Sequence, residues 1–93
     1  MSARLSGLTI GALTLDPTFD ADVASYTANT TNATNTITAT PEDEGATVTI
    51  LNGETPVGNG TAATWSEGAN TVTITVKNGT AQEVYTVTVT KTT

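Results

Sequence analysis

Two runs of alternating apolar and hydroxyl residues form the clearest pattern in this chain. In residues 68–91, valine, isoleucine and tyrosine alternate with threonine on either side of Asn78-Gly79. Because side chains of a strand point alternately to its two faces, each run sends its large apolar residues one way and its threonines the other. Asn and Gly both tolerate positive φ, which favours a tight turn between the runs. The pattern predicts an antiparallel hairpin, and the rest of the chain must cover its apolar face, since a lone hairpin is marginal in water.

Shorter alternating segments, separated by turn signals, fill the remaining sequence. Two pieces within residues 5–15 are separated by Gly11, which indicates a bulge or a jump of the chain from one sheet to the other. Asp16-Pro17 is expected to end this stretch, because proline has no N–H to donate. Further strands are expected at 25–28, 36–40, 46–51 and 61–65, with a weak edge segment at 54–60.

Short strands with turn signals roughly every 8–12 residues are typical of a β-sandwich. The pattern therefore predicts an all-β sandwich of about seven antiparallel strands in two sheets. No window has apolar residues at helical spacing, and no internal repeat is found. We expect one domain over residues 1–93, with an ordered core over about 5–91.

The inward positions of these segments make up the expected core. Phe19 lies in a polar loop and is expected to fold back over the end of the core, and Trp65 is expected in the core or at its rim. The predicted core consists of Leu8, Ile10, Leu13, Leu15, Phe19, Tyr26, Ile37, Val48, Ile50, Trp65, Val72, Ile74, Val76, Tyr85, Val87 and Val89.

Composition limits what such a core can contain. The hydrophobic share of 37% suffices for one thin core and is too small for a deep active-site cavity. About a quarter of the residues are threonine, which suits solvent-facing strand positions. The sequence has no cysteine, so a disulfide framework is excluded.

The charge of the chain excludes several classes of partner. Nine acids against three bases give a net charge of −6, which argues against binding to nucleic acid and to anionic membranes. Solubility is the expected consequence rather than an acidic recognition patch. We find neither a signal-peptide pattern nor an apolar stretch long enough to insert into a membrane. We expect either a domain cut from an exported protein or a protein made and used without Sec export, and the length of 93 residues favours the second.

Candidate chemistry is sparse. Two acidic clusters are the weak candidates for a calcium site, and we expect them to be solvated turn residues. Their members are Asp20, Asp22, Glu42, Asp43 and Glu44. No histidine or cysteine is present to activate a nucleophile, and the serines are isolated, so we expect no catalytic residue, no cofactor and no enzyme activity.

The lysines and threonines of the predicted hairpin are two further surface features. A lysine–asparagine isopeptide crosslink would need a buried lysine, and Lys77 and Lys91 are expected to continue the threonine faces and point to water. The threonine faces could bind carbohydrate or a protein neighbour, although an inert outer surface is the simpler interpretation because aromatic platforms are missing there. These faces carry Thr71, Thr73, Thr75, Thr86, Thr88 and Thr90.

The opening combines a leucine-rich first strand, a Pro-x-Phe loop and a tyrosine that begins the next strand. The end combines Gly-x-Asn, alternating Val/Ile, an Asn-Gly turn and Tyr-x-Val-x-Val. In these motifs both ends of the sequence resemble the cadherin-like β-sandwich modules of bacterial and phage surface proteins, while residues 47–64 match only in general character. The matching residues are Leu5, Leu8, Leu13, Pro17, Phe19 and Tyr26, and then Gly68, Asn70, Val72, Ile74, Val76, Asn78, Gly79, Tyr85, Val87 and Val89. The resemblance implies an immunoglobulin-like fold and a non-catalytic spacer, adhesive or decorating role.

Taken together, these features predict a structural or interaction module. The first hypothesis is an immunoglobulin-like accessory protein that decorates a phage capsid or tail, with a virion protein as its partner and the virion surface as its location. The alternative is an adhesive or carbohydrate-binding accessory domain of a secreted bacterial surface protein or enzyme, located outside the cell. A calcium-rigidified linker is a more distant third.

Overall fold

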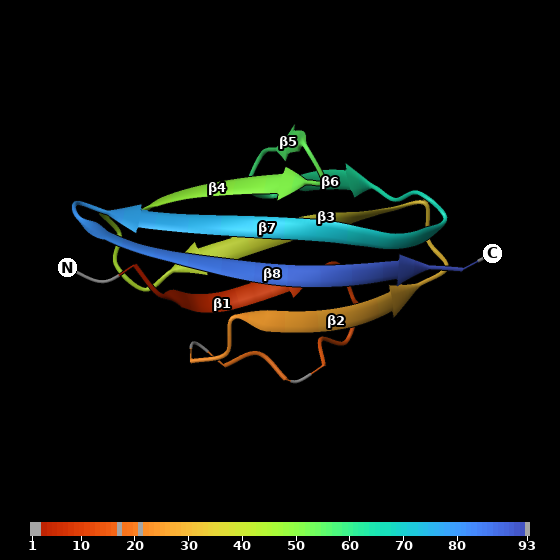
Figure 1. Cartoon of the computed structure of the whole chain (residues 1–93), viewed down its shortest axis with the longest axis horizontal. Helices are drawn as coiled ribbons and strands as arrows, with labels where there is room; N and C mark the ends of the chain where they lie inside the picture. The colour runs from red at the N-terminus through yellow and green to blue at the C-terminus, as the bar shows by residue number, and fades with distance from the viewer. Residues whose placement is uncertain (1–2, 17, 21, 93) are drawn as a thin grey trace.

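Eight strands form the regular structure of the described residues, 3–16, 18–20 and 22–92, in a computed structural model (Figure 1). The strands are β1 (Leu5–Ile10), β2 (Ser25–Thr30), β3 (Thr34–Pro41), β4 (Thr47–Asn52), β5 (Thr55–Val57), β6 (Thr61–Thr64), β7 (Gly68–Asn78) and β8 (Ala81–Lys91). Among these residues no helix is long and apolar enough to cross a membrane.

The strands form two sheets that face each other, so the predicted all-β sandwich is confirmed. One sheet has the order β1-β3-β6, and the other has the order β2-β8-β7-β4-β5 (Figure 1). The expectation that every pairing is antiparallel was wrong, because β2 pairs with β8 in parallel. The chain runs back along the sandwich between β1 and β2, so β2 starts at the same end as β8. A parallel pair cannot be joined by a tight turn, and here residues 31–80, with five other strands, separate the two strands.

Gly11 is the point at which the chain leaves the first sheet. Its φ is +56°, and a Cβ added there would lie 2.6 Å from Nδ2 of Asn35, so a side chain meets both backbone strain and a clash. The second alternating piece expected before Asp16 does not form a strand. Instead, Asp16 and Thr27 exchange two backbone hydrogen bonds of 2.8 Å, which attach this loop to the edge of β2. Pro17 lies outside the described residues.

The predicted hairpin is confirmed as β7 and β8, although its turn lies one residue further along. Val72 pairs with Val87 and Asn78 with Ala81, so Gly79-Thr80 forms the two-residue loop and Gly79 takes a φ of +62°. Asn78 is therefore the last residue of its strand. It is buried, and its side-chain amide donates to Oδ2 of Asp43 at 2.9 Å.

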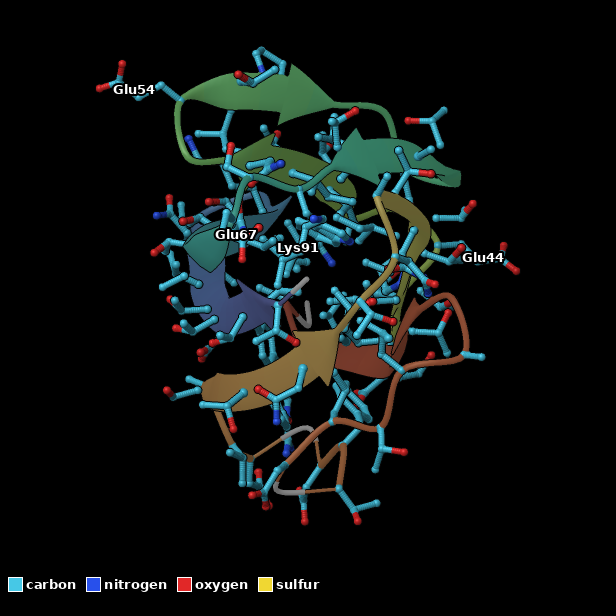
Figure 2. All side chains as sticks on the ribbon, turned by 90° about the vertical axis from the view of Figure 1, so that its right-hand side faces the viewer. Glu44, Glu54, Glu67 and Lys91 are labelled. Carbon is cyan, nitrogen blue, oxygen red and sulfur yellow. The ribbon has the colours of Figure 1, made fainter. Side chains whose placement is uncertain are left out.

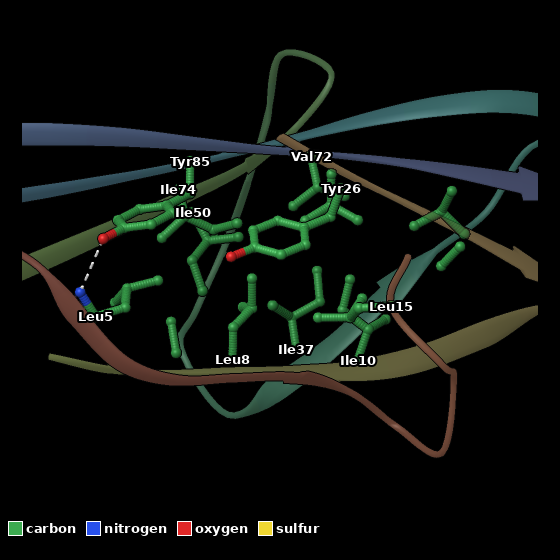
Figure 3. Close-up of a cluster of buried hydrophobic side chains, with 14 of the residues drawn as sticks. Leu5, Leu8, Ile10, Leu15, Tyr26, Ile37, Ile50, Val72, Ile74 and Tyr85 are labelled. Carbon is green, nitrogen blue, oxygen red and sulfur yellow. Dashed lines mark hydrogen bonds between the residues drawn. The ribbon is translucent and has the colours of Figure 1, made fainter. Parts of the chain in front are cut away.

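Side chains from both sheets meet in one continuous core (Figure 3). Thirteen of the sixteen expected core residues are buried, and Leu13, Phe19 and Val48 are half-buried against them. These three lie in loops or near a strand end, where neighbours cover only one side. Ala3, Leu5, Ala28, Ala39 and Ala63 complete the buried set.

The two tyrosines of the core bring their hydroxyls to backbone groups. The Tyr85 hydroxyl accepts a hydrogen bond from the backbone N–H of Leu5 at 3.2 Å, which ties β8 to β1 across the sandwich (Figure 3). The Tyr26 hydroxyl donates to the carbonyl of Asp20 at 2.5 Å and accepts from its N–H at 3.0 Å. Phe19 stacks on Tyr26 with ring centroids 5.8 Å apart. Burial raises the pKa of Tyr26, and the hydrogen bond with Asp20 opposes this rise.

The fold is long and narrow, with extents of 42 × 24 × 17 Å. β1 starts near one end of the long axis and β8 finishes at the other (Figure 1). The two ends of the domain therefore point in opposite directions.

Candidate functional site

Carboxylates of both acidic clusters bond to neighbouring groups of the protein. Asp22 forms an ion pair with Arg4, and Oδ1 of Asp20 accepts from the N–H of Asp22 at 2.9 Å. In the second cluster, Oδ1 of Asp43 accepts from the N–H of Gly45 at 2.9 Å, while Glu42 and Glu44 are exposed. Within residues 3–16, 18–20 and 22–92, no group of three or more His, Cys, Asp or Glu side chains is placed to hold a metal.

Lys91 corrects one of the surface expectations. Lys77 is exposed on the threonine face, but Lys91 lies two residues beyond Val89 and so continues the core face of β8. Only 18% of its side chain is exposed, and its Nζ lies 3.9 Å from Oε2 of Glu67 (Figure 2). The prediction that Lys91 points to water was therefore wrong. At the end of the sandwich the lysine stem covers apolar core while the ammonium reaches a carboxylate.

The threonine face covers the outside of the five-stranded sheet. Thr71 pairs with Thr88, and Thr73 pairs with Thr86, so their side chains stand next to each other across the hairpin. Thr71 is exposed, and the other five threonines of this face are half-buried because each shields its neighbours. Val84, with 41% of its surface exposed, is the large apolar residue on this side of β8.

A polar groove at the end of the sandwich where β8 finishes was not foreseen from the sequence. Its volume is about 430 Å³, and three segments far apart in the chain form it: the β4–β5 turn, the end of β6 with the residues after it, and the start of β7. Asn52, Gly53, Thr55, Thr64, Ser66, Ala69, Asn70 and Thr71 line it.

Two asparagines hold the walls of this groove together. Asn52 donates its amide N–H to the carbonyl of Thr64 at 2.8 Å, joining β4 to β6 across the two sheets. Asn70 accepts from the N–H of Ser66 at 2.9 Å and donates to its carbonyl at 2.8 Å. The N–H of Gly53 donates to the carbonyl of Thr71 at 2.7 Å. The groove is therefore fixed in shape by hydrogen bonds within the protein.

The groove presents hydrogen-bonding groups that the fold leaves unused. The hydroxyls of Thr55, Thr64, Ser66 and Thr71 belong to exposed residues and take part in no hydrogen bond within the part of the chain that the structure describes. The amide oxygen of Asn52 likewise accepts none there. No charged or aromatic residue lines the groove. It can donate and accept hydrogen bonds, but it holds no group suited to acid–base or nucleophilic chemistry.

Sequence reasoning missed this groove because its residues are ordinary turn and strand-end residues when read singly. Two signals pointed to it: Asn52-Gly53, interpreted as a turn, and the Gly-x-Asn of Gly68 and Asn70. Gly68 has a φ of +93°, and Asn70 is buried. The motif is thus a local clamp at the start of β7.

Comparison with known families accounts for nearly the whole chain. Residues 5–92 match the family model described as "Cadherin-like beta sandwich domain". No curated protein matches the chain.

Proposed function

We propose, since the chain belongs to the cadherin-like β-sandwich domain family, that this domain decorates a larger assembly such as a phage capsid or tail. Members of this family are structural or interaction modules rather than enzymes, and a larger assembly is the context in which we place this domain. The domain would attach to a protein of the assembly through one end or edge of the sandwich.

The placement of the two ends of the domain carries this proposal. The first strand begins near one end of a 42 Å axis and the last strand finishes at the other (Figure 1). A module of this shape can keep two structures that are attached at its opposite ends about one domain length apart. This is the geometry that a spacer or a projecting decoration requires.

The outer surface also supports a role in display. The threonine face is polar, and most acids lie in the connections between strands, so the net charge of −6 is spread over several parts of the surface. Such a surface keeps the domain soluble and discourages self-association. Contacts with a partner would then be made locally, at an end or an edge.

Cosedimentation tests this proposal. Labelled domain is spun with purified virions, or with the envelope fraction of the bacterium that carries the gene, at about 150 mM salt. Saturable pelleting that unlabelled domain displaces is the expected result. A domain that stays in the supernatant with both preparations contradicts the proposal.

The polar groove favours a second candidate function, an adhesive or carbohydrate-binding accessory domain of a secreted bacterial surface protein or enzyme. Its hydroxyls and the amide oxygen of Asn52 are groups of the kind with which proteins bind sugars. In this setting the partner is a glycan rather than a virion protein.

A further inference from the structure

We propose that the polar groove between the β4–β5 turn, the end of β6 and the start of β7 binds a neutral carbohydrate. This inference rests on the second of the two proposed functions and assigns it a site. Of the threonine face, only Thr71, which also lines the groove, takes part in the binding.

The hydrogen-bonding groups of the groove define the class of ligand. Each free hydroxyl can donate one hydrogen bond and accept others, and the amide oxygen of Asn52 can only accept. A sugar ring carries adjacent hydroxyls that both donate and accept, so it can satisfy such a mixed set. A hydrophobic ligand would leave Thr64, Ser66 and Thr71 without partners in the bound state, which is unfavourable.

The groove is organised before any ligand arrives. Asn52 and Asn70 hold the segment from Thr64 to Ser66 with hydrogen bonds of 2.8–2.9 Å, and Gly53 is bonded to Thr71. A ligand therefore does not have to order a loop, so less of its binding free energy is lost to entropy. The volume of about 430 Å³ falls in the range of roughly 300–1,000 Å³ usual for small-molecule sites.

Two carboxylates near the groove indicate which sugars it rejects. Glu54 lies between the lining residues Gly53 and Thr55, and Glu67 directly follows Ser66. In Figure 2, Lys91 lies beside Glu67, and Glu54 projects outward at the edge of the molecule. Lys91 offsets part of the charge of Glu67, and Glu54 projects into solvent. The net negative field disfavours a uronic acid relative to its neutral parent sugar.

The lining also sets the strength of binding. Trp65 is buried, and its indole N–H donates to Oδ1 of Asn35 at 2.8 Å, so it offers no platform for a sugar ring. Hydrogen bonds alone, in competition with water, support weak binding, with a Kd of about 1 mM for a single sugar. Several domains acting together would be needed for firm attachment.

The test is an NMR titration of ¹⁵N-labelled domain with glucose, galactose, mannose, N-acetylglucosamine and glucuronic acid. We expect at least one neutral sugar to shift the side-chain amide signals of Asn52 and Asn70 and the backbone signal of Ser66. Glucuronic acid should bind at least about 3-fold more weakly than glucose. Thr64→Val and Ser66→Ala should each raise the Kd about 3- to 10-fold, since each removes one hydroxyl and leaves the asparagine clamps intact. Thr75→Val, on the threonine face but away from Thr71, is the matched control and should not change the Kd.

Three results would overturn the inference: no shift with any sugar at about 50 mM, shifts centred on the threonine face away from Thr71, or stronger binding of glucuronic acid than of glucose. The spectrum of each variant shows directly whether it is folded. Cosedimentation with virions does not depend on the groove, so Thr64→Val should pellet with particles as the unmodified domain does. Failure of sugar binding can therefore be distinguished from failure of particle attachment.

Discussion

Replacing Asn70 with alanine should destabilise the domain more than any surface substitution. The side chain of Asn70 is 9% exposed and holds the start of β7 against its surroundings. Its Oδ1 accepts from the N–H of Ser66 at 2.9 Å. Its Nδ2 donates to the carbonyls of Ser66, Gly68 and Val89 at 2.8, 3.1 and 3.2 Å. Two amide hydrogens serve three carbonyls, so at least one hydrogen is shared.

These contacts set the size of the effect. The side chain supplies the equivalent of three hydrogen bonds, each with a net value of about 1 kcal/mol. Ser66 is exposed, so water can replace part of what alanine removes, whereas the carbonyl of Val89 lies in the buried region. We therefore expect a loss of about 2–3 kcal/mol in the free energy of unfolding. For a domain of this size that corresponds to a Tm lower by about 8–24 °C.

Urea unfolding followed by fluorescence measures this loss, because the single tryptophan, Trp65, is 5% exposed in the folded domain. The midpoint should fall while the m-value stays the same. Asn29→Ala is the matched control. Asn29 is exposed on β2, and its replacement should change the stability by less than about 0.5 kcal/mol.

Asn70→Asp refines the test. At neutral pH a carboxylate oxygen replaces the amide N–H and faces three carbonyls, so the variant should be less stable than Asn70→Ala. The folded state disfavours this ionised group and raises its pKa, so the variant should regain stability as the pH falls and the group is protonated. The interpretation of Asn70 as a clamp is wrong if Asn70→Ala is as stable as Asn29→Ala.

Four other outcomes can be checked with the same unfolding assay. Tyr26→Phe removes the hydroxyl bonded to Asp20 and should cost about 1 kcal/mol. The folded state raises the pKa of Tyr26 above its ordinary value of 10.0. The stability that this shift contributes is complete below the ordinary pKa and is lost as the pH rises through the raised pKa. Tyr26→Phe should therefore reduce the loss of stability at alkaline pH. Gly11→Ala should lower the free energy of unfolding more than Gly53→Ala. Both glycines have positive φ, but only Gly11 has a neighbour within 4 Å of the added Cβ. Equal losses of stability would refute the proposed clash. Ile74→Ala, which opens a cavity in the core, should cost about 2–5 kcal/mol, and a loss below about 1 kcal/mol would contradict the close packing of the two sheets. EDTA should leave the Tm unchanged, whereas a fall that calcium restores would identify a metal site at the acidic turns.

The failures of sequence reasoning occurred where the outcome depends on contacts between distant segments. Lys91 was assigned to the threonine face, although its odd number places it with Val87 and Val89, so this error was one of counting. The parallel pairing of β2 with β8 was different in kind. Periodicity reports which face of a strand is apolar but not which strand lies beside it or in which direction it runs.

Periodic alternation determined the all-β class, the β7–β8 hairpin and most of the core. Successive residues of a strand point to opposite faces, so the alternation of apolar and polar residues shows which face is buried. Only the folded chain decided that β2 joins the sheet of β8. The tertiary structure also brought Asn52, Thr64 and Asn70 to one groove. The hydrogen bond from Asn52 to the carbonyl of Thr64 requires segments that are separate in sequence to meet in space, and no local pattern encodes such a meeting.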